Sequence, residues 1–169
     1  MKKILLVLVV ILIVIQFIRP EKNIHPQPQP SDISSLYAVP ADVDSILVKA
    51  CNDCHSNNTR YPWYNNIQPV AWWLKNHIDE GKRQLNFNEF ASYPAFRKYD
   101  NIKEIKKQID EGGMPISSYT LIHTDARLTD AEKKTITTWS ENIRQQLEAN
   151  YPKDSLIRKR GPGEPADED

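Results

Sequence analysis

Hydrophobic positions recur at three- and four-residue intervals in four segments of the chain. These segments span residues 40–51, 69–78, 99–111 and 129–147, and each places its apolar side chains on one face of a helix. The last segment opens with Thr-Asp-Ala-Glu, whose Thr and Glu have the spacing of a capping box. No run of alternating β-branched residues indicates a strand. The pattern therefore predicts an all-α domain.

The N-terminus differs, because its apolar residues are continuous rather than periodic. Lys2 and Lys3 precede an apolar run over residues 4–18 that only Gln16 interrupts, an arrangement typical of an export signal. The run is about 15 residues long, which is short for a spanning helix, but no small-residue cleavage site follows it. We predict an uncleaved signal-anchor or transmembrane helix over residues 1–19, which attaches the protein to a membrane with the two lysines inside.

Composition separates the periodic helices from the rest of the chain. Residues 20–37 contain the sequence Pro-Gln-Pro-Gln-Pro, which favours an extended spacer without a core. The chain ends in a stretch that has no large apolar residue to bury. We predict a Pro-rich linker over residues 20–37, a folded domain over residues 38–150 and a disordered charged tail over residues 151–169.

Lys and Arg total 22, as do Asp and Glu, so bulk charge gives no reason to expect a nucleic-acid partner.

The only two cysteines, Cys51 and Cys54, lie three positions apart and are followed directly by His55. This pattern is typical of c-type haem attachment. Two thiols on one helical turn can reach both vinyl groups of a haem, and the adjacent imidazole can bind the iron. The helix predicted over residues 40–51 leads directly into the motif. We predict one covalently bound haem c, attached through Cys51 and Cys54, with His55 as the proximal iron ligand.

Three other interpretations of the cysteine pair fit less well. A thioredoxin-like redox pair follows a strand, whereas a helix precedes this motif. A structural zinc site needs four ligands, and His25, His77 and His123 form no second pair at ligand spacing. A plain disulfide would leave His55 unexplained.

The second axial position of a haem iron has two candidate ligands in the sequence. Met114 is the only methionine apart from the initiator, and it follows two glycines and precedes Pro115, in a loop whose backbone can pass close to a porphyrin. His77 lies on the apolar face of the helix predicted over residues 69–78. We favour Met114 as the distal ligand, with His77 as the alternative. Either side chain could instead be an ordinary core residue.

Several of these features together resemble known haem proteins between about residue 36 and residue 147. A helix that enters Cys-x-x-Cys-His, a later Gly-x-Met-Pro loop and a C-terminal helix with Trp139 resemble monohaem cytochrome c. The aromatic-rich sequence over residues 57–64 and the later Leu-Asn-Phe at residues 85–87 are similar to a bacterial haem-binding domain family of small exported proteins.

The resemblance implies a cytochrome c-like helical fold in which Cys51 and Cys54 carry the haem, His55 is the proximal ligand and Met114 the distal one. A six-coordinate iron has no open site for substrate, so the expected activity is one-electron transfer by a carrier rather than catalysis by an enzyme. We expect the protein to be anchored in the bacterial inner membrane and to face the periplasm, where it would meet redox partner proteins. The alternative is a haem protein with an open or labile sixth site, a peroxidase or a gas or redox sensor, with His77 as a distal base.

One group of aromatic residues is predicted to form part of the haem-pocket wall. Its members are Tyr61, Trp63, Tyr64, Trp72 and Trp73. They lie in the stretch over residues 60–90, which is longer than the corresponding loop of ordinary short cytochromes c.

Overall fold

The structure is a computed structural model that describes residues 1–158. Within this range the chain forms helices and no β-strand, which confirms the predicted all-α class. The α-helices are α1 (Lys2–Ile15), α2 (Ala41–Ala50), α3 (Asn52–His55), α4 (Val70–Gln84), α5 (Ala95–Asp110), α6 (Ser117–Ile122) and α7 (Asp130–Asn150). The short 3-10 helices are η1 (Ile33–Ser35), η2 (Trp63–Asn66), η3 (Phe87–Ser92), η4 (Thr124–Ala126) and η5 (Lys153–Ser155).

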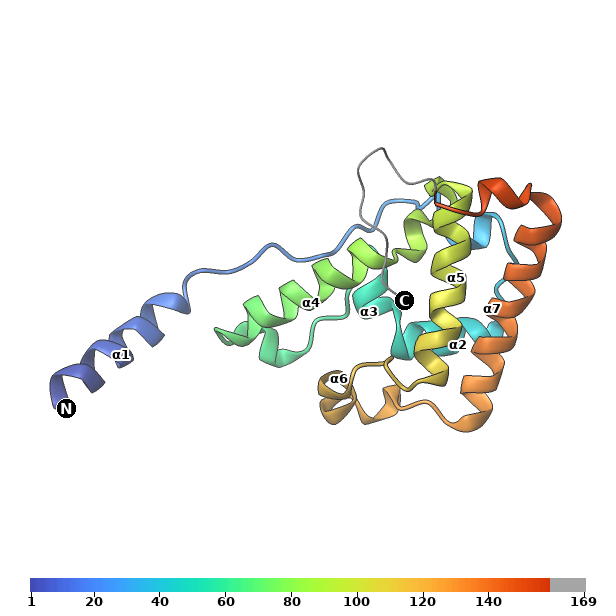
Figure 1. The fold of residues 1–169 in the computed structure, drawn as a ribbon. Coiled ribbons are helices and arrows are strands. Elements are labelled where there is room, and N and C mark those ends of the chain that lie inside the picture. Colours follow the sequence, from blue (N-terminus) through green and yellow to red (C-terminus); the bar gives the residue numbers. More distant parts are fainter. Residues whose placement is uncertain (159–169) are drawn as a thin grey trace.

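The main core lies between α5 and α7, which run side by side (Figure 1). Ile102 and Ile109 of α5 and Ile136 and Leu147 of α7 are each at most 4 % exposed. Within each helix the two residues are separated by steps of three and four residues, so they lie on one side of that helix. These two sides face each other. Burial of one such side chain stabilises the fold by roughly 1.5–3 kcal/mol relative to leaving it in water.

Helix α7 begins at the capping box that the sequence predicts. Thr129 Oγ1 accepts a hydrogen bond from the Glu132 backbone N–H over 3.3 Å, and Glu132 Oε2 accepts one from the Thr129 N–H over 2.9 Å. The other carboxylate oxygen of Glu132 forms a 2.5 Å ion pair with Lys49 of α2. The start of α7 and the end of α2 are thus joined.

Helix α2 brings the chain to the cysteine motif. Its residues Val43, Ile46 and Leu47 are buried in the same core as α5 and α7. Cys51 is the only residue between α2 and the short helix α3, and it caps the end of the first and the start of the second. The motif therefore starts from a point that the core holds fixed.

The structure does not support the transmembrane helix predicted over residues 1–19. Helix α1 ends at Ile15, and the Gln16 side chain then hydrogen-bonds to the Leu12 carbonyl and to the backbone of Gln68. A helix of 14 residues is about 21 Å long, less than the roughly 30 Å of a bilayer's hydrocarbon core. No helix within the described part of the chain is long and apolar enough to cross a membrane.

The segment predicted as a linker over residues 20–37 is joined to the folded domain. Asn23 is 7 % exposed, and Ile33 and Tyr37 belong to the main core. A single antiparallel bridge links Ile24 to Asn58, just after the cysteine motif. Buried side chains before and after the prolines fix this segment to the domain.

The tail predicted over residues 151–169 is only partly described. Residues 151–158 include η5, and Leu156 is buried in the main core at 6 % exposure. Residues 159–169 lie outside the described residues.

Candidate functional site

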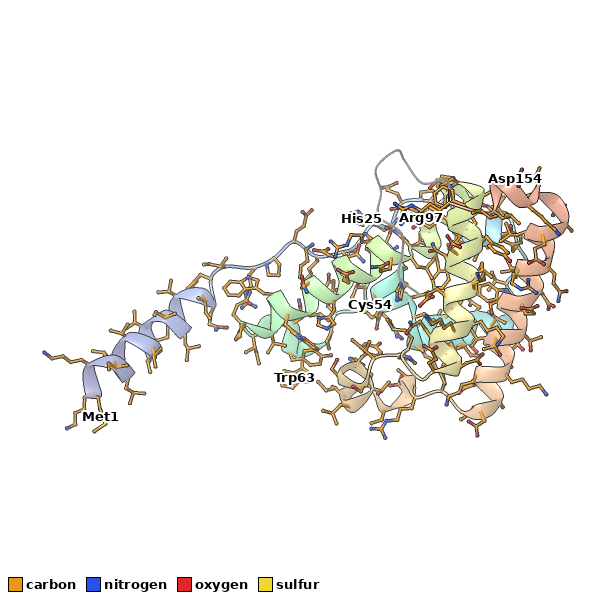
Figure 2. The ribbon with its side chains drawn as sticks, in the orientation of Figure 1. Met1, His25, Cys54, Trp63, Arg97 and Asp154 are labelled. Atoms are coloured by element: carbon orange, nitrogen blue, oxygen red, sulfur yellow. The ribbon has the colours of Figure 1, made fainter. Side chains whose placement is uncertain are left out.

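The cysteine motif folds into one tight helical turn. The backbone N–H groups of Cys54 and His55 both donate to the carbonyl oxygen of Cys51, over 3.1 and 2.9 Å. This turn puts the two thiols and the imidazole on one short piece of backbone, near the centre of the molecule (Figure 2). Cys51 and Cys54 are both free thiols.

A backbone carbonyl sets the orientation of the His55 ring. Nδ1 lies 2.9 Å from the oxygen of Leu85, the residue that directly follows α4. Because a carbonyl oxygen can only accept, Nδ1 carries the proton and the lone pair is on Nε2. Burial lowers the pKa of His55, and the hydrogen bond to Leu85 opposes this effect. The lowered pKa favours the neutral imidazole, which is the form that binds metals. The Phe87 ring meets the imidazole edge to face, with centroids 6.4 Å apart.

Both cysteines are protonated near neutral pH. Burial raises the pKa of the Cys51 thiol to about 12, and burial together with the charge of Asp53 raises that of Cys54 to about 11. A reactive Cys-x-x-Cys redox pair has the opposite property, a lowered pKa. Within residues 1–158, no group of three or more His, Cys, Asp or Glu side chains is arranged to hold a metal ion, as a zinc site would require.

A glycine allows α4 to lie directly against the motif. A Cβ atom added to Gly81 would come within 2.6 Å of the Cys54 carbonyl oxygen and 3.0 Å of the Cys54 Cβ. Neither neighbour is the end of a flexible side chain, so any larger residue would push the two helices apart. The contact brings the end of α4, with Leu85, within reach of His55.

Two cavities adjoin the motif, with volumes of about 400 and 250 Å³. Cys51, His55 and Met114 line both of them. The larger cavity has a mostly apolar wall, which includes Leu47, Leu85, Phe87, Ile105, Ile109 and Ile136. The smaller one is bounded by side chains that include Cys54, His77 and Tyr119. The structure thus brings the predicted proximal and distal ligands to the same space.

Met114 is held at the cavity by the way in which α5 ends. Gly112 has a φ of +71°, and its N–H donates to the Ile109 carbonyl over 3.3 Å. The Gly113 N–H donates to the Gln108 carbonyl over 2.8 Å, which completes a Schellman motif. The chain therefore turns sharply, and Met114 follows with 39 % of its surface exposed.

The alternative ligand, His77, reaches only the smaller cavity. Its Nδ1 lies 2.9 Å from the Trp73 carbonyl oxygen one turn earlier in α4, and its ring packs against the Trp73 ring with centroids 4.2 Å apart. His77 is thus half-buried on the side of α4, whereas Met114 lies at both cavities.

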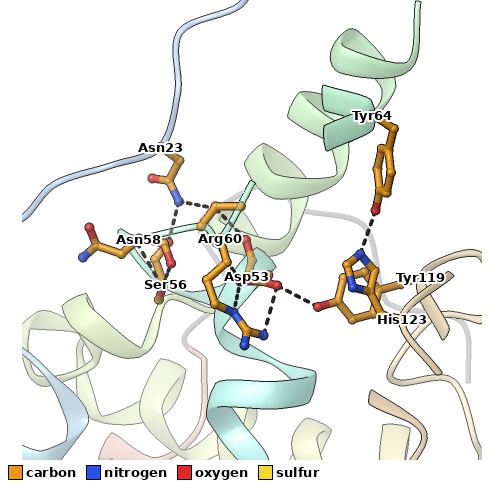
Figure 3. Close-up of polar contacts among 9 residues, drawn as sticks. Asn23, Asp53, Ser56, Asn58, Arg60, Tyr64, Tyr119 and His123 are labelled. Atoms are coloured by element: carbon orange, nitrogen blue, oxygen red, sulfur yellow. Dashed lines mark hydrogen bonds and ion pairs between the residues drawn. The ribbon is translucent and has the colours of Figure 1, made fainter. Parts of the chain in front are cut away.

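A buried carboxylate joins the motif to two other parts of the chain (Figure 3). Asp53 Oδ1 accepts hydrogen bonds from the backbone N–H and the Nε of Arg60, over 3.0 and 3.1 Å. Its Oδ2 accepts from the Tyr119 hydroxyl over 2.7 Å. The Tyr119 ring stacks on His123 at 4.4 Å between centroids, and His123 Nε2 lies 2.7 Å from the Tyr64 hydroxyl.

Comparison with known families identifies the class of ligand that this protein binds. The model of a haem-binding domain matches residues 10–142. The chain belongs to the haem-binding domain family. No curated protein and no solved structure matched it. Haem is therefore the cofactor to compare with the cysteine motif and the two cavities beside it.

The residues around the larger cavity fit a haem. Its aliphatic and aromatic wall suits a porphyrin, and His55 directs an unprotonated nitrogen away from Leu85. Asn101 also lines this cavity, and its buried Nδ2 has no hydrogen-bond partner within the described residues. A buried donor without an acceptor costs free energy, and a haem propionate is an acceptor that would satisfy it.

The predicted aromatic wall does not line either cavity. Trp63 is 76 % exposed, and Trp73 is 45 % exposed. The aromatic residues that do line the cavities are Phe87 and Tyr119. Sequence periodicity could not find these two, because Phe87 lies in a 3-10 helix and Tyr119 in a helix of only six residues. Asn101 was also missed, since a polar residue in a helix normally indicates its solvated face.

Proposed function

We propose that this protein is an exported c-type cytochrome that carries single electrons, with its haem bound to Cys51 and Cys54 and its iron bound by His55 and Met114. The observation that carries the proposal is that all four residues line the smaller cavity, and that Cys51, His55 and Met114 also line the larger cavity with its apolar wall. Covalently attached haem supplies an iron that exchanges one electron between its ferrous and ferric states.

The two thiols would each add across one vinyl group of the haem. In each addition a bond forms between Sγ and a vinyl carbon, the π bond of the vinyl group breaks, and the thiol hydrogen moves to the other vinyl carbon. No oxidant or reductant is consumed. The raised pKa values of Cys51 and Cys54 are unlike the lowered ones of a disulfide-exchange pair.

Two properties of the protein favour electron transfer over reaction with a substrate. A thioether ligand opposite a histidine fills the sixth position and raises the reduction potential, and an apolar surround disfavours the extra charge of the ferric state. Met114 is 39 % exposed, so this wall of the site reaches the molecular surface, where a partner could exchange electrons.

Export to the bacterial periplasm is part of the proposal. Haem is attached to Cys-x-x-Cys-His motifs outside the cytoplasm, and Lys2 and Lys3 followed by the apolar α1 are typical of an export signal. Periplasmic redox proteins are the class of partner that this location implies.

Haem staining and absorption spectroscopy test the proposal in two steps. After denaturing electrophoresis, only a covalently bound haem stays with the chain, and we expect staining that is lost when both cysteines are replaced by serine. The oxidised protein should then show the weak near-infrared band of methionine-ligated haem, and Met114→Ala should abolish it while His77→Ala leaves it unchanged. An unstained protein would refute covalent attachment. A spectrum that responds to His77→Ala and not to Met114→Ala would refute the ligand assignment and favour a peroxidase or gas sensor instead.

A further inference from the structure

The loop that carries Met114 is fixed to the rest of the molecule at both of its ends. Before Met114, the Schellman motif ties Gly113 to the last turn of α5. After Met114, the chain enters α6, where the backbone N–H of Tyr119 donates to the Ile116 carbonyl over 3.0 Å. The backbone of Tyr119 is thus hydrogen-bonded to Ile116, two residues beyond Met114.

The second attachment ends in the haem-attachment motif itself. The Tyr119 hydroxyl donates to Asp53 over 2.7 Å, and Asp53 lies between the two cysteines in the sequence (Figure 3). Asp53 cannot easily follow a moving loop, because Arg60 binds its carboxylate and Thr59 Oγ1 donates to its backbone carbonyl over 2.7 Å. Asp53, Tyr119 and Met114 all line the smaller cavity.

The Tyr119 ring is also supported from its other side. His123 stacks on it with an interplanar angle of 18°, and Tyr64 of η2 holds His123 by its hydroxyl. Burial and the hydrogen bond to Asp53 both raise the pKa of Tyr119, so its hydroxyl keeps the proton that it donates. The contact is therefore a hydrogen bond from a neutral phenol to a buried charge, a strong class of hydrogen bond.

We propose that Tyr119 is a positioning residue for the sixth iron ligand. Its hydrogen bond to Asp53 couples the Met114 loop to the cysteine motif, and so would keep the Met114 sulfur available as a ligand to a haem bound there. This inference rests on the proposed function, in which Met114 binds the iron. In this role Tyr119 does not contact the iron. It acts on Met114 instead, by determining how often the methionine sulfur dissociates from the iron.

The consequence is a measurable competition at the sixth position. An added ligand such as imidazole binds ferric iron only when methionine has left, so its apparent affinity rises as the methionine-bound state is weakened. Loss of one hydrogen bond to a buried carboxylate changes such an equilibrium on the order of tenfold. The loop would still reach the iron, but it would be released more often.

The test is imidazole titration of the oxidised, haem-loaded full chain. We expect Tyr119→Phe to bind imidazole on the order of tenfold more tightly than the unaltered protein. The matched control is Tyr99→Phe, which also removes a 2.7 Å hydrogen bond from a tyrosine hydroxyl to a carboxylate, that of Glu148 on α7. This control should leave imidazole affinity unchanged. Equal imidazole affinities of Tyr119→Phe and Tyr99→Phe would overturn the inference.

A second variant decides the question if Tyr119→Phe does not fold. His123→Ala removes the ring behind Tyr119 and leaves the hydroxyl and the carboxylate in place, so we expect a smaller rise in imidazole affinity. No rise in this variant would count against the proposed role. Failure of the proposed function is distinguishable, because the unaltered protein would then lack the near-infrared methionine band before any imidazole is added.

Discussion

Buried side chains are mostly apolar between α5 and α7, where Lys98 and Ser140 are exceptions, but largely polar around α3. Ile102 and Ile136 represent the first region, whereas Asp53, Ser56 and Thr59 represent the second, each at most 7 % exposed. Apolar burial is non-directional and contributes most of the free energy of folding. A hydrogen bond has a net contribution of only about 0.5–1.5 kcal/mol, but it fixes distance and angle. The comparison teaches that one region stabilises the domain and that the other fixes the geometry of the Cys-x-x-Cys-His motif.

The largest effect on stability is expected in the α5–α7 core. Leu147 is fully buried, so Leu147→Ala removes apolar contacts and leaves a cavity. We expect the free energy of unfolding to fall by about 2–5 kcal/mol. The absorption spectrum of the folded haem protein should not change, because Leu147 lines neither haem cavity. Chemical denaturation measures the first quantity, and Gln146→Ala on the exposed face of the same helix is the control.

The next effect concerns the contact between α3 and α4. Gly→Ala in an open helix position stabilises a protein by up to about 1 kcal/mol. Gly81→Ala should do the opposite, since its Cβ would lie 2.6 Å from the Cys54 carbonyl oxygen. We expect both the unfolding midpoint and the yield of attached haem per chain to fall. A variant that is more stable than the unaltered protein would show that the close packing of α4 on the motif is wrong.

A smaller effect is expected from the buried carboxylate. Asp53→Asn keeps the shape of the side chain but removes the charge that pairs with Arg60 and accepts from Tyr119. Because the Arg60 side chain is 57 % exposed, solvent screens part of this interaction, and we expect a loss of about 1–2 kcal/mol in unfolding free energy. Asp44→Asn, an exposed acid in α2, is the control. Equal unfolding free energies for the two variants would mean that the polar region contributes no stability.

The smallest effect changes sign with the cofactor. In protein prepared without haem, Asn101→Leu removes a buried donor that has no partner within the described residues, so stability should be unchanged or rise by up to about 1 kcal/mol. In haem-loaded protein the same change removes a donor to a propionate, and stability should fall. Thermal unfolding of both forms measures the two values. A shift in the same direction in both would exclude Asn101 as a haem contact.

The sequence predicts the apolar region far better than the polar one. The spacing of Ile136, Trp139 and Ile143 locates α7, and the capping box locates its start, because helix periodicity and capping are local properties. The motif at residues 51–55 likewise indicates haem from local spacing alone. Fold class and cofactor class could therefore be predicted, and both agree with the structure and the family.

The parts that could not be predicted depend on contacts between residues far apart in the chain. Tyr119 meets Asp53 across 66 positions, and Leu85 meets His55 across 30. No periodicity encodes such pairs. The structure does not support the transmembrane prediction, and the length of the apolar run did not reveal that α1 would end at Ile15 or that the Gln16 side chain would hydrogen-bond to Gln68.

The central claim is that Cys51 and Cys54 bind one haem covalently, and the mass of the denatured chain tests it most directly. Intact-protein mass spectrometry of the mature protein should show the chain mass plus that of one haem. Fragmentation should locate this addition on residues 51–55, and replacement of both cysteines by serine should remove it. A denatured chain that carries no added mass, from a preparation that contains haem when folded, would contradict the account.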